Sequence, residues 1–366
     1  MTRRAAIALA LCLASLVAVG PARAEDAPAQ ADIDAAIRKG AEYLQKRSGS
    51  ARHDELTGFA LLHAGVPADE PAVASRVDKV LAEAPIDTYR LSLAIMLLEA
   101  ADRDKHQRRI AELAQVLADM QCANGQWSYG DRTRKEEDPP TTPDPQPQTP
   151  APKKHAAGGK TEVRKPRIRL KFGPKGPPKG DNSNTQFALL GLRAAEDAGV
   201  EVAPETWALA KKFWHEAQKQ DGGYGYHDAK FSDASYGSMT CVGLASVVLC
   251  DFYLKQDWTK EPSVPRAADW IAKNFTLDKN PFDPKPQLKQ SRQYYWLYSI
   301  ERAGVFAKLE KFGAHAWYAE GARYLLKEQA DNGSWNTNTC DTCFAILFLR
   351  KATSPLKQRV YTPGGG

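Results

Sequence analysis

Asp341 and Cys343, in the last apolar stretch of the chain, have side chains that could hold a metal ion. Carboxylate, thiolate and imidazole groups are all zinc ligands. In the structural alternative, Asp341 caps the start of a helix and Cys343 packs as a small apolar residue. A disulfide between Cys343 and either Cys241 or Cys340 is a third interpretation. We predict no cofactor from this pattern, with zinc as the alternative.

A second group of residues is aromatic and could line a pocket for an apolar or carbocationic ligand. Aromatic faces stabilise cations and bury large apolar areas. Core packing and wedges within turns explain the same residues without a ligand. The group comprises Tyr224, Tyr226, Tyr236, Tyr294, Tyr295, Trp296 and Tyr298.

Two charged patterns have both chemical and structural interpretations. Asp87 and Asp341 could be the two carboxylates that a glycosidase places on either side of a sugar bond. Glu301 and Arg302 are neighbours near the end of a predicted helix, where a buried ion pair or a loop anchor explains them without catalysis.

These residues are positioned by a turn that the chain repeats three times. Each copy contains Gly followed by an aromatic residue, comes after a Gln-bearing helix end and precedes a more apolar helix. Gly allows backbone angles that other residues avoid, and the aromatic side chain is expected to pack between neighbouring helix pairs. The copies are residues 124–127, 221–224 and 332–335, with Gln121, Gln220 and Gln329 just before them.

Helical periodicity covers most of the chain and predicts twelve helices in six pairs. The first helix of each pair has one apolar stripe, whereas the second is apolar nearly all round and must be enclosed. This pattern predicts an all-α fold, a closed (α/α)6 toroid with a helical core from about 32 to 351. The outer helices are expected at about 32–47, 70–83, 105–120, 204–219, 263–274 and 314–329, and the inner ones at about 55–64, 87–101, 183–198, 236–253, 290–303 and 340–351.

In such a ring the starts of the inner helices meet at one end of the central cavity. Helix dipoles make that end suitable for an anion or a polarised group. We therefore take the residues near these starts as candidate cavity-rim residues. They are Asp87, Asn182, Asn184, Thr185, Tyr224, Tyr226, His227, Ser238, Cys241, Arg292, Tyr294, Asp341 and Cys343.

Residues 1–24 have the basic start, apolar stretch and small-residue cleavage site of a secretory signal. We expect export to the periplasm or the medium, with one mature domain over residues 25–366. A Pro-rich insertion at 131–180 interrupts it, too poor in apolar residues to fold alone. Within it, residues 151–180 carry ten Lys and Arg and one acid. They are either a solvated linker or a contact for a polyanion or an anionic membrane surface, without specific nucleic-acid recognition.

The Gln, Gly and aromatic turn before an apolar helix resembles the glutamine–tryptophan repeats of squalene–hopene cyclases. The wider group is the terpenoid cyclase and protein prenyltransferase α/α-toroid superfamily. Residues 181–188, 313–318 and 341–345 are also similar to bacterial prenyltransferase/squalene-oxidase-repeat proteins. The resemblance covers about 32–351 and implies the toroid fold and an isoprenoid-like ligand.

The chain also departs from these families. It has no Asp-x-Asp-Asp acid of class II cyclases, and its helices suffice for one toroid where those cyclases use two. Asp341 and Cys343 match the Asp-x-Cys zinc pair of prenyltransferases, but the His would have to be His227 or His315 from another repeat. We therefore expect a toroid that binds an apolar small molecule or a protein in its central cavity. The alternatives are an isoprenoid-processing enzyme, with or without a metal ion, and a carbohydrate-active (α/α)6 enzyme.

Overall fold

The computed structural model describes residues 27–47, 53–130, 144–145, 167–227, 234–284 and 292–356. The predicted signal, residues 1–24, lies outside the described residues, as does most of the predicted insertion. No helix in the described ranges combines the length and the apolarity needed to cross a membrane.

The described chain is almost entirely helical. Its α-helices are α1 (Gln30–Gln45), α2 (Asp54–His63), α3 (Pro71–Ala82), α4 (Thr88–Asp119), α5 (Asn182–Asp197), α6 (Pro204–Ala217), α7 (Gly237–Tyr253), α8 (Ser263–Lys273), α9 (Gln293–Ala307), α10 (Trp317–Glu328) and α11 (Thr339–Leu349). A short 3-10 helix, η1 (Trp258–Lys260), precedes α8. Asp102 has non-helical angles (φ −169°, ψ 90°) and divides α4 into an inner part and an outer part. The described chain thus contains the twelve predicted helices.

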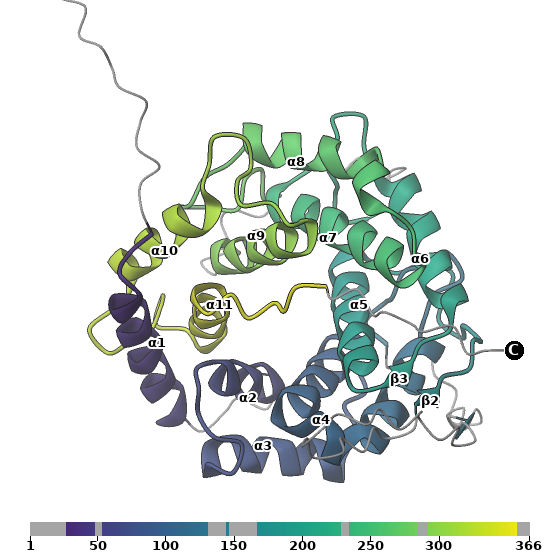
Figure 1. Ribbon diagram of the computed structural model, residues 1–366, viewed down its shortest axis with the longest axis horizontal. Helices are drawn as coiled ribbons and strands as arrows, with labels where there is room; N and C mark the ends of the chain where they lie inside the picture. Colours follow the sequence, from purple (N-terminus) through teal and green to yellow (C-terminus); the bar gives the residue numbers. More distant parts are fainter. Residues whose placement is uncertain are drawn as a thin grey trace, which may run out of the picture.

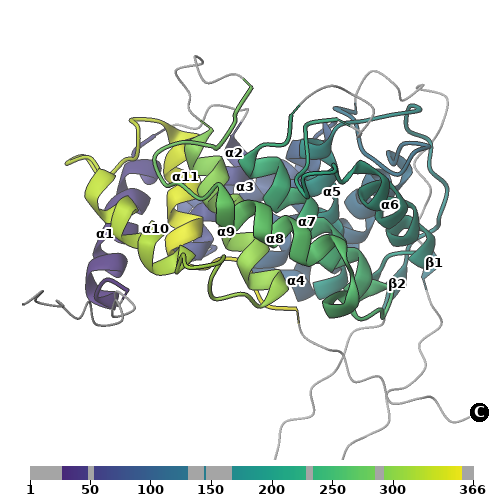
Figure 2. The same cartoon turned by 90° about the horizontal axis from the view of Figure 1, so that it is seen from above.

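The helices form two concentric layers around one axis (Figure 1). The inner layer contains α2, the first part of α4, α5, α7, α9 and α11, and each of these helices packs against the next. The ring closes because α11 packs against α2 and α1. The predicted (α/α)6 toroid is therefore confirmed. Since all the outer helices run one way and the inner ones the other, every outer-to-inner connection lies at the same end of the ring (Figure 2). We call this end the loop face.

Each copy of the repeated turn ties its own helix pair to the next pair. In the first copy, the N–H of Trp127 donates to Thr185 Oγ1 (3.0 Å), at the start of the following inner helix. Gln121 Nε2 donates to the carbonyl of Gly125 (3.3 Å) and to that of Thr206 (3.0 Å) in the next outer helix, α6. One amide group thus holds both its own turn and the neighbouring pair.

The last copy of the turn uses the same bonds to close the ring. Gln329 Nε2 donates to the carbonyls of Gly333 (2.9 Å) and Ala36 (2.8 Å), the latter in α1. Gly333 has φ +85°, and a Cβ there would lie 2.3 Å from the carbonyl oxygen of Lys39. Glycine is required for both reasons, because the conformation is left-handed and the backbone of α1 is in contact.

The middle copy corrects one residue of the predicted repeat. Gln218, rather than Gln220, donates to the carbonyls of Gly222 (3.0 Å) and Ser263 (2.8 Å). Gln218 precedes Gly222 by four residues, as Gln121 precedes Gly125 and Gln329 precedes Gly333, whereas Gln220 precedes it by two. Tyr224 takes the place of the tryptophan, and its N–H donates to Thr240 Oγ1 (3.2 Å).

The last part of the predicted insertion, residues 167–180, lies against the ring. It contributes β2 (Ile168–Arg169) to a small sheet in the order β1 (Asp144–Pro145), β2, β3 (Val200–Glu201). Strand β2 pairs antiparallel with β1 and parallel with β3, with Ile168 opposite Val200. Leu170 is buried in the core. The C-terminal end of this insertion is therefore fixed to the ring.

The C-terminal segment, residues 350–356, crosses the end of the ring opposite the loop face (Figure 1, yellow). Arg350 Nε donates to the carbonyl of His63 at the end of α2 (2.9 Å). Thr353 bonds to Glu301 of α9, and Arg193 of α5 donates to the carbonyl of Ser354 (2.9 Å). Contacts with three inner helices hold this segment across the ring.

Candidate binding face at the starts of the inner helices

Asn182, Asn184 and Thr185 are buried at the start of α5, where they hold the turn. Asn182 accepts from Gln126 Nε2 (2.9 Å) and donates to the carbonyl of Gly225 (2.9 Å). Asn184 bonds through its backbone and its amide to Asp181, the N-cap of α5 (2.9 and 2.8 Å). Their polar atoms are thus used inside the protein, which favours a structural role for these three candidates.

Asp341 and Cys343 point to different partners. Asp341 accepts from Asn336 Nδ2 (2.9 Å), and burial raises the pKa of its carboxyl to about 6. Cys343 is fully buried beside Thr57 Oγ1 (3.9 Å), and burial raises the pKa of its thiol to about 12. Within the described residues, no cluster of three or more His, Cys, Asp or Glu side chains could hold a metal ion. The donor set that zinc requires is therefore not assembled around this pair.

None of the five cysteines in the described ranges is in a disulfide, so neither of the disulfides considered from the sequence forms. Cys241 is buried in α7, where desolvation raises the pKa of its thiol well above the usual value. Such a thiol is packed as an apolar group and is a poor nucleophile.

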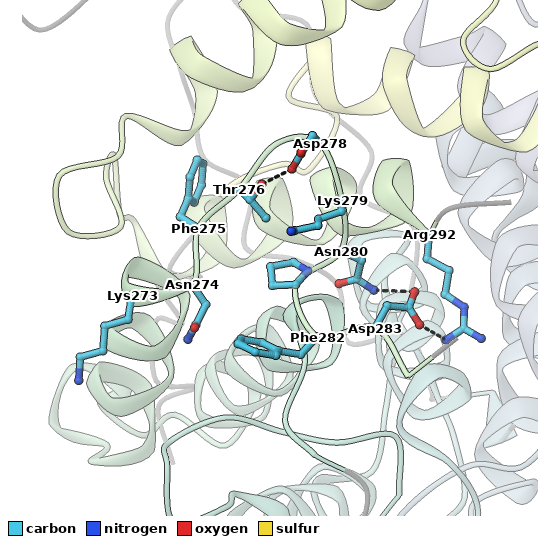
Figure 3. Close-up of a pocket in the computed structure, with 11 residues that line it drawn as sticks. Lys273, Asn274, Phe275, Thr276, Asp278, Lys279, Asn280, Phe282, Asp283 and Arg292 are labelled. Atoms are coloured by element: carbon cyan, nitrogen blue, oxygen red, sulfur yellow. Dashed lines mark hydrogen bonds and ion pairs between the residues drawn. The ribbon is translucent and has the colours of Figure 1, made fainter. Parts of the chain in front are cut away.

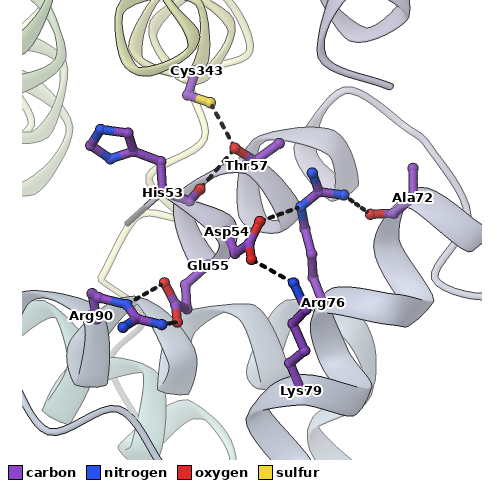
Figure 4. A network of polar contacts seen from close by, with 9 residues as sticks. All are labelled: His53, Asp54, Glu55, Thr57, Ala72, Arg76, Lys79, Arg90 and Cys343. Carbon is purple, nitrogen blue, oxygen red and sulfur yellow. Dashed lines mark hydrogen bonds and ion pairs between the residues drawn. The ribbon is translucent and has the colours of Figure 1, made fainter. Parts of the chain in front are cut away.

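A network at the start of α2 was not anticipated from the sequence (Figure 4). Glu55 receives two bonds from Arg90 of α4, at 2.7 and 3.1 Å. Asp54 pairs with Lys79 (2.8 Å) and Arg76 (3.6 Å) of α3. The sequence signal that could have revealed this network is the presence of two acids in the first turn of an otherwise apolar helix, because buried charges must be paired. The network joins three helices and leaves neither acid free for catalysis.

Asp87 caps α4, with its carboxylate accepting from the N–H of Arg90 (2.9 Å). Tyr224 is fully buried, and Tyr294 is buried in the first turn of α9. Tyr226 and His227 are half-buried beside the start of α5, where Tyr226 Oη lies 2.9 Å from Tyr129 Oη. Of these candidates, Asp87, Tyr226 and His227 are half-buried and keep surface that could contact a ligand.

Ser238 and Arg292 meet the loop between α8 and α9, which forms a pocket of about 560 Å³ (Figure 3). The loop is held by Asn280, which accepts from the N–H of Ser238 (2.8 Å) and donates to its Oγ (3.0 Å). Arg292 pairs with Asp283 (3.6 Å) on one wall. The pocket is lined by Lys273, Asn274, Phe275, Thr276, Asp278, Lys279, Asn280, Pro281, Phe282, Asp283 and Arg292. Its volume is that of small-molecule sites.

Among the described residues of the loop face, Phe282, Ile86 and Tyr129 are large apolar side chains that are exposed. Phe282 is 65% exposed beside the pocket and has φ +55°, a left-handed conformation that non-glycine residues seldom adopt. Ile86 (67%) and Tyr129 (65%) are neighbours, since the N–H of Thr88 bonds to the carbonyl of Tyr129. Exposed apolar groups near a concave site are a feature of interaction surfaces.

Aromatic side chains from four inner helices line the interior of the ring and contact one another. Ring centroids are 4.5 Å apart for Tyr89 and Phe187, and 6.2 Å apart for Phe187 and Tyr295. Phe344 continues the cluster, 5.7 Å from Tyr295 and 5.1 Å from Tyr298. Of the aromatic group expected to line a pocket, Tyr295 and Tyr298 face inward. Tyr298 is buried against Phe344, whereas Tyr295 is half-buried between Phe187 and Phe344.

The fold defines the class of this protein as a terpene-cyclase-like α/α toroid. It is similar to that of a variant of the type II terpene cyclase MstE from Scytonema, solved with its substrate geranylgeranyl dihydroxybenzoate. The TM-score is 0.52 at 12% sequence identity, covering 88% of this chain and 98% of the cyclase. No family description matches the sequence, and no curated protein matches it. At this identity the similarity shows the fold alone.

Proposed function

We propose that this chain is an exported toroid protein that binds a ligand or a protein partner at the loop face and does not cyclise terpenes. The observation that carries the proposal is the contrast between the two parts of the ring. The loop face has a pocket of about 560 Å³ and exposed Phe282, Ile86 and Tyr129. In the interior, aromatic side chains from four inner helices contact one another, and the C-terminal segment crosses the opposite end. The binding expected in the central cavity is therefore proposed at its mouth.

The charge of the interior also opposes cyclase chemistry. Arg302 lies against Tyr298 with its guanidinium carbon 3.7 Å from the ring centroid, and 6.0 Å from that of Tyr295. A carbocation about 6 Å from this guanidinium would be destabilised by roughly 3 kcal/mol at an effective dielectric constant near 20. The aromatic faces that would stabilise a carbocation are thus already beside a positive charge.

Site-specific photo-crosslinking in the exporting cell tests the proposal. A photoreactive phenylalanine analogue at Phe282 or Tyr129 is expected to capture a defined molecule. The same analogue at Glu310, exposed in the connection between α9 and α10 at the opposite end, is the matched control. Capture from position 310 at equal yield would contradict binding at the loop face.

An isoprenoid-processing enzyme is the second candidate, favoured by the aromatic interior and by Asp341, whose pKa is raised to about 6 by burial. A buried acid with a raised pKa can donate a proton. Incubation with polyprenyl and squalene-like substrates, with and without zinc, tests this candidate. Product formation that is lost in Asp341→Asn would establish it and overturn the binding proposal.

The proposal includes export and a role for the basic insertion. Amino-terminal sequencing of the secreted protein is expected to begin near Glu25, and an intact amino terminus would contradict cleavage.

Three basic residues at the end of the insertion already form ion pairs with the ring. Arg167 pairs with Glu196 (3.1 Å), Arg169 with Glu201 (3.3 Å) and Lys175 with Asp119 (3.4 Å). Contact with an anionic lipid would therefore rest on residues 153–165, which lie outside the described residues. Vesicle co-sedimentation of a chain lacking 153–165 tests that contact, and unchanged binding would refute it.

A further inference from the structure

The pocket between α8 and α9 is formed by a loop that the ring holds in place. One continuous segment, residues 273–283, supplies all but one of the side chains that line the pocket. The indole N–H of Trp296 donates to the carbonyl of Thr276 (2.8 Å), and the N–H of Gly237 donates to that of Pro281 (2.8 Å). Because these bonds fix the loop on two inner helices, the pocket exists before a ligand arrives and little ordering is needed for binding.

The lining of this pocket has an excess of positive charge. It contains three cations and two acids, a net charge of +1. Arg292 pairs with Asp283 (3.6 Å), and Asp278 accepts from the hydroxyl of a threonine in the same loop. Lys273 and Lys279 are exposed, and neither forms an ion pair with another described residue. The pocket can therefore accept one negative charge, whereas the two acids oppose a second.

Phe282 adds an apolar surface beside these cations. Its side chain is 65% exposed, and its backbone is held at φ +55°. Such strained conformations persist only where the surroundings impose them, and they are concentrated at ligand sites. The ring meets the buried Trp270 edge-on, with the centroids 6.0 Å apart. Lys279 reaches back toward Pro281, the residue before Phe282 (Figure 3), so a cation and an aromatic ring border the same space.

We propose that this pocket binds a small organic acid with one carboxylate and one apolar group. The carboxylate lies at Lys279 and the apolar group packs against Phe282. This inference rests on the function proposed above and narrows the ligand of the loop face to one chemical class. A single carboxylate matches the net charge of the lining, whereas a dicarboxylate or a phosphorylated ligand brings charge that Asp278 and Asp283 repel.

Fluorine NMR titration of small probes against the purified protein tests the class of ligand. The first probe, para-fluorophenylbutyrate, has one carboxylate and one apolar ring. The uncharged para-fluorophenylbutanol is expected to bind at least about fivefold more weakly, because it cannot form a charge-assisted hydrogen bond with the lysine. Para-fluorobenzylmalonate, with two carboxylates, is expected to bind no more tightly than the butyrate. An equal Kd for the acid and the alcohol, or tighter binding of the malonate, would overturn the inference.

Variants locate the binding within the pocket. Lys279→Glu should weaken binding of the acid about fivefold or more and leave binding of the alcohol unchanged. Lys311→Glu, exposed in the connection between α9 and α10 at the opposite end of the ring, is the matched control and should change neither. Phe282→Gly removes the ring and relieves the left-handed conformation, so both probes should bind more weakly while the Tm is kept or raised. Unchanged binding in Lys279→Glu or in Phe282→Gly would overturn the inference.

The same measurements separate this inference from the proposed function. Photo-crosslinked capture of a molecule at position 282 or 129, with no binding of the acid probe, would overturn the class of ligand alone and leave binding at the loop face standing. Binding of the acid that depends on Lys279 and Phe282 supports the class of ligand directly.

Discussion

Replacing Glu301 by glutamine should stabilise the protein and flatten the dependence of its stability on pH. Glu301 is fully buried in α9, and both carboxylate oxygens accept bonds from Thr353 in the C-terminal segment. The N–H of Thr353 donates to Oε1 (3.0 Å) and its hydroxyl donates to Oε2 (2.6 Å). Glutamine has nearly the same shape and keeps an acceptor for the N–H, but it carries no charge to desolvate.

The magnitude follows from the pKa of the buried carboxyl. Burial raises that pKa from 4.5 to about 7. The folded protein therefore binds more protons than the unfolded chain between these values, and the free energy of unfolding falls as the pH rises through this window. The separation of about 2.5 between the two pKa values corresponds to about 3 kcal/mol. The cost is absent below about pH 4.5 and complete above about pH 7.

Urea denaturation from pH 4 to pH 8 measures this effect as the difference between the two proteins. A difference is needed because Glu99, with a pKa raised to about 7 by burial, adds to the slope. His63, with a pKa lowered to about 4 by burial, opposes it. Glu301→Gln should gain about 3 kcal/mol over the unaltered protein at pH 8 and little at pH 4. The exposed control Glu42→Gln should show no such trend. A gain that is the same at both pH values would refute the reasoning.

Three further changes test the ring itself by urea denaturation. Trp335→Ala should cost about 3–5 kcal/mol, because it empties a fully buried site between helix pairs. Gly333→Ala should lower the free energy of unfolding by more than about 1 kcal/mol, since φ is +85° and α1 leaves no room for a Cβ. Gly173→Ala is the control, because a Cβ there would meet nothing within 4 Å, and it should change the free energy of unfolding by no more than about 0.5 kcal/mol. Equal losses for both glycines would contradict that account. Arg90→Met should cost about 3–5 kcal/mol by leaving Glu55 buried and unpaired, and pairing it with Glu55→Gln should restore much of the loss.

The candidate site was predicted less well than the fold, and particular residues show why. The positions of Asn182, Ser238 and Asp341 at the starts of inner helices were correct. Their polar atoms, however, bond to Gly225, Asn280 and Asn336 within the protein, partners that lie in loops rather than in the helices. The conformation of these loops depends on their contacts with the rest of the ring, so the spacing of residues along the sequence does not predict it.

The choice of Gln220 over Gln218 has a different origin, because the sequence does distinguish them. Gln218 precedes Gly222 by four residues, the spacing of Gln121 from Gly125 and of Gln329 from Gly333, whereas Gln220 precedes it by two. The selection is made by the carbonyl of Ser263, at the start of α8, which only Gln218 reaches. Of the two structural explanations considered for Glu301, a buried ion pair or a loop anchor, the contacts with Thr353 match the loop anchor.

By itself the sequence determined the twelve helices, their grouping in pairs and the turn that joins them, because helical periodicity and the glycine-bearing turn are local properties. Only the tertiary structure decided which inward side chains meet. Arg302 reaches Gln186, and Thr353 reaches Glu301, because of how each helix is rotated about its own axis within the closed ring. That rotation is set by packing against both neighbours at once, so no single segment of the chain specifies it.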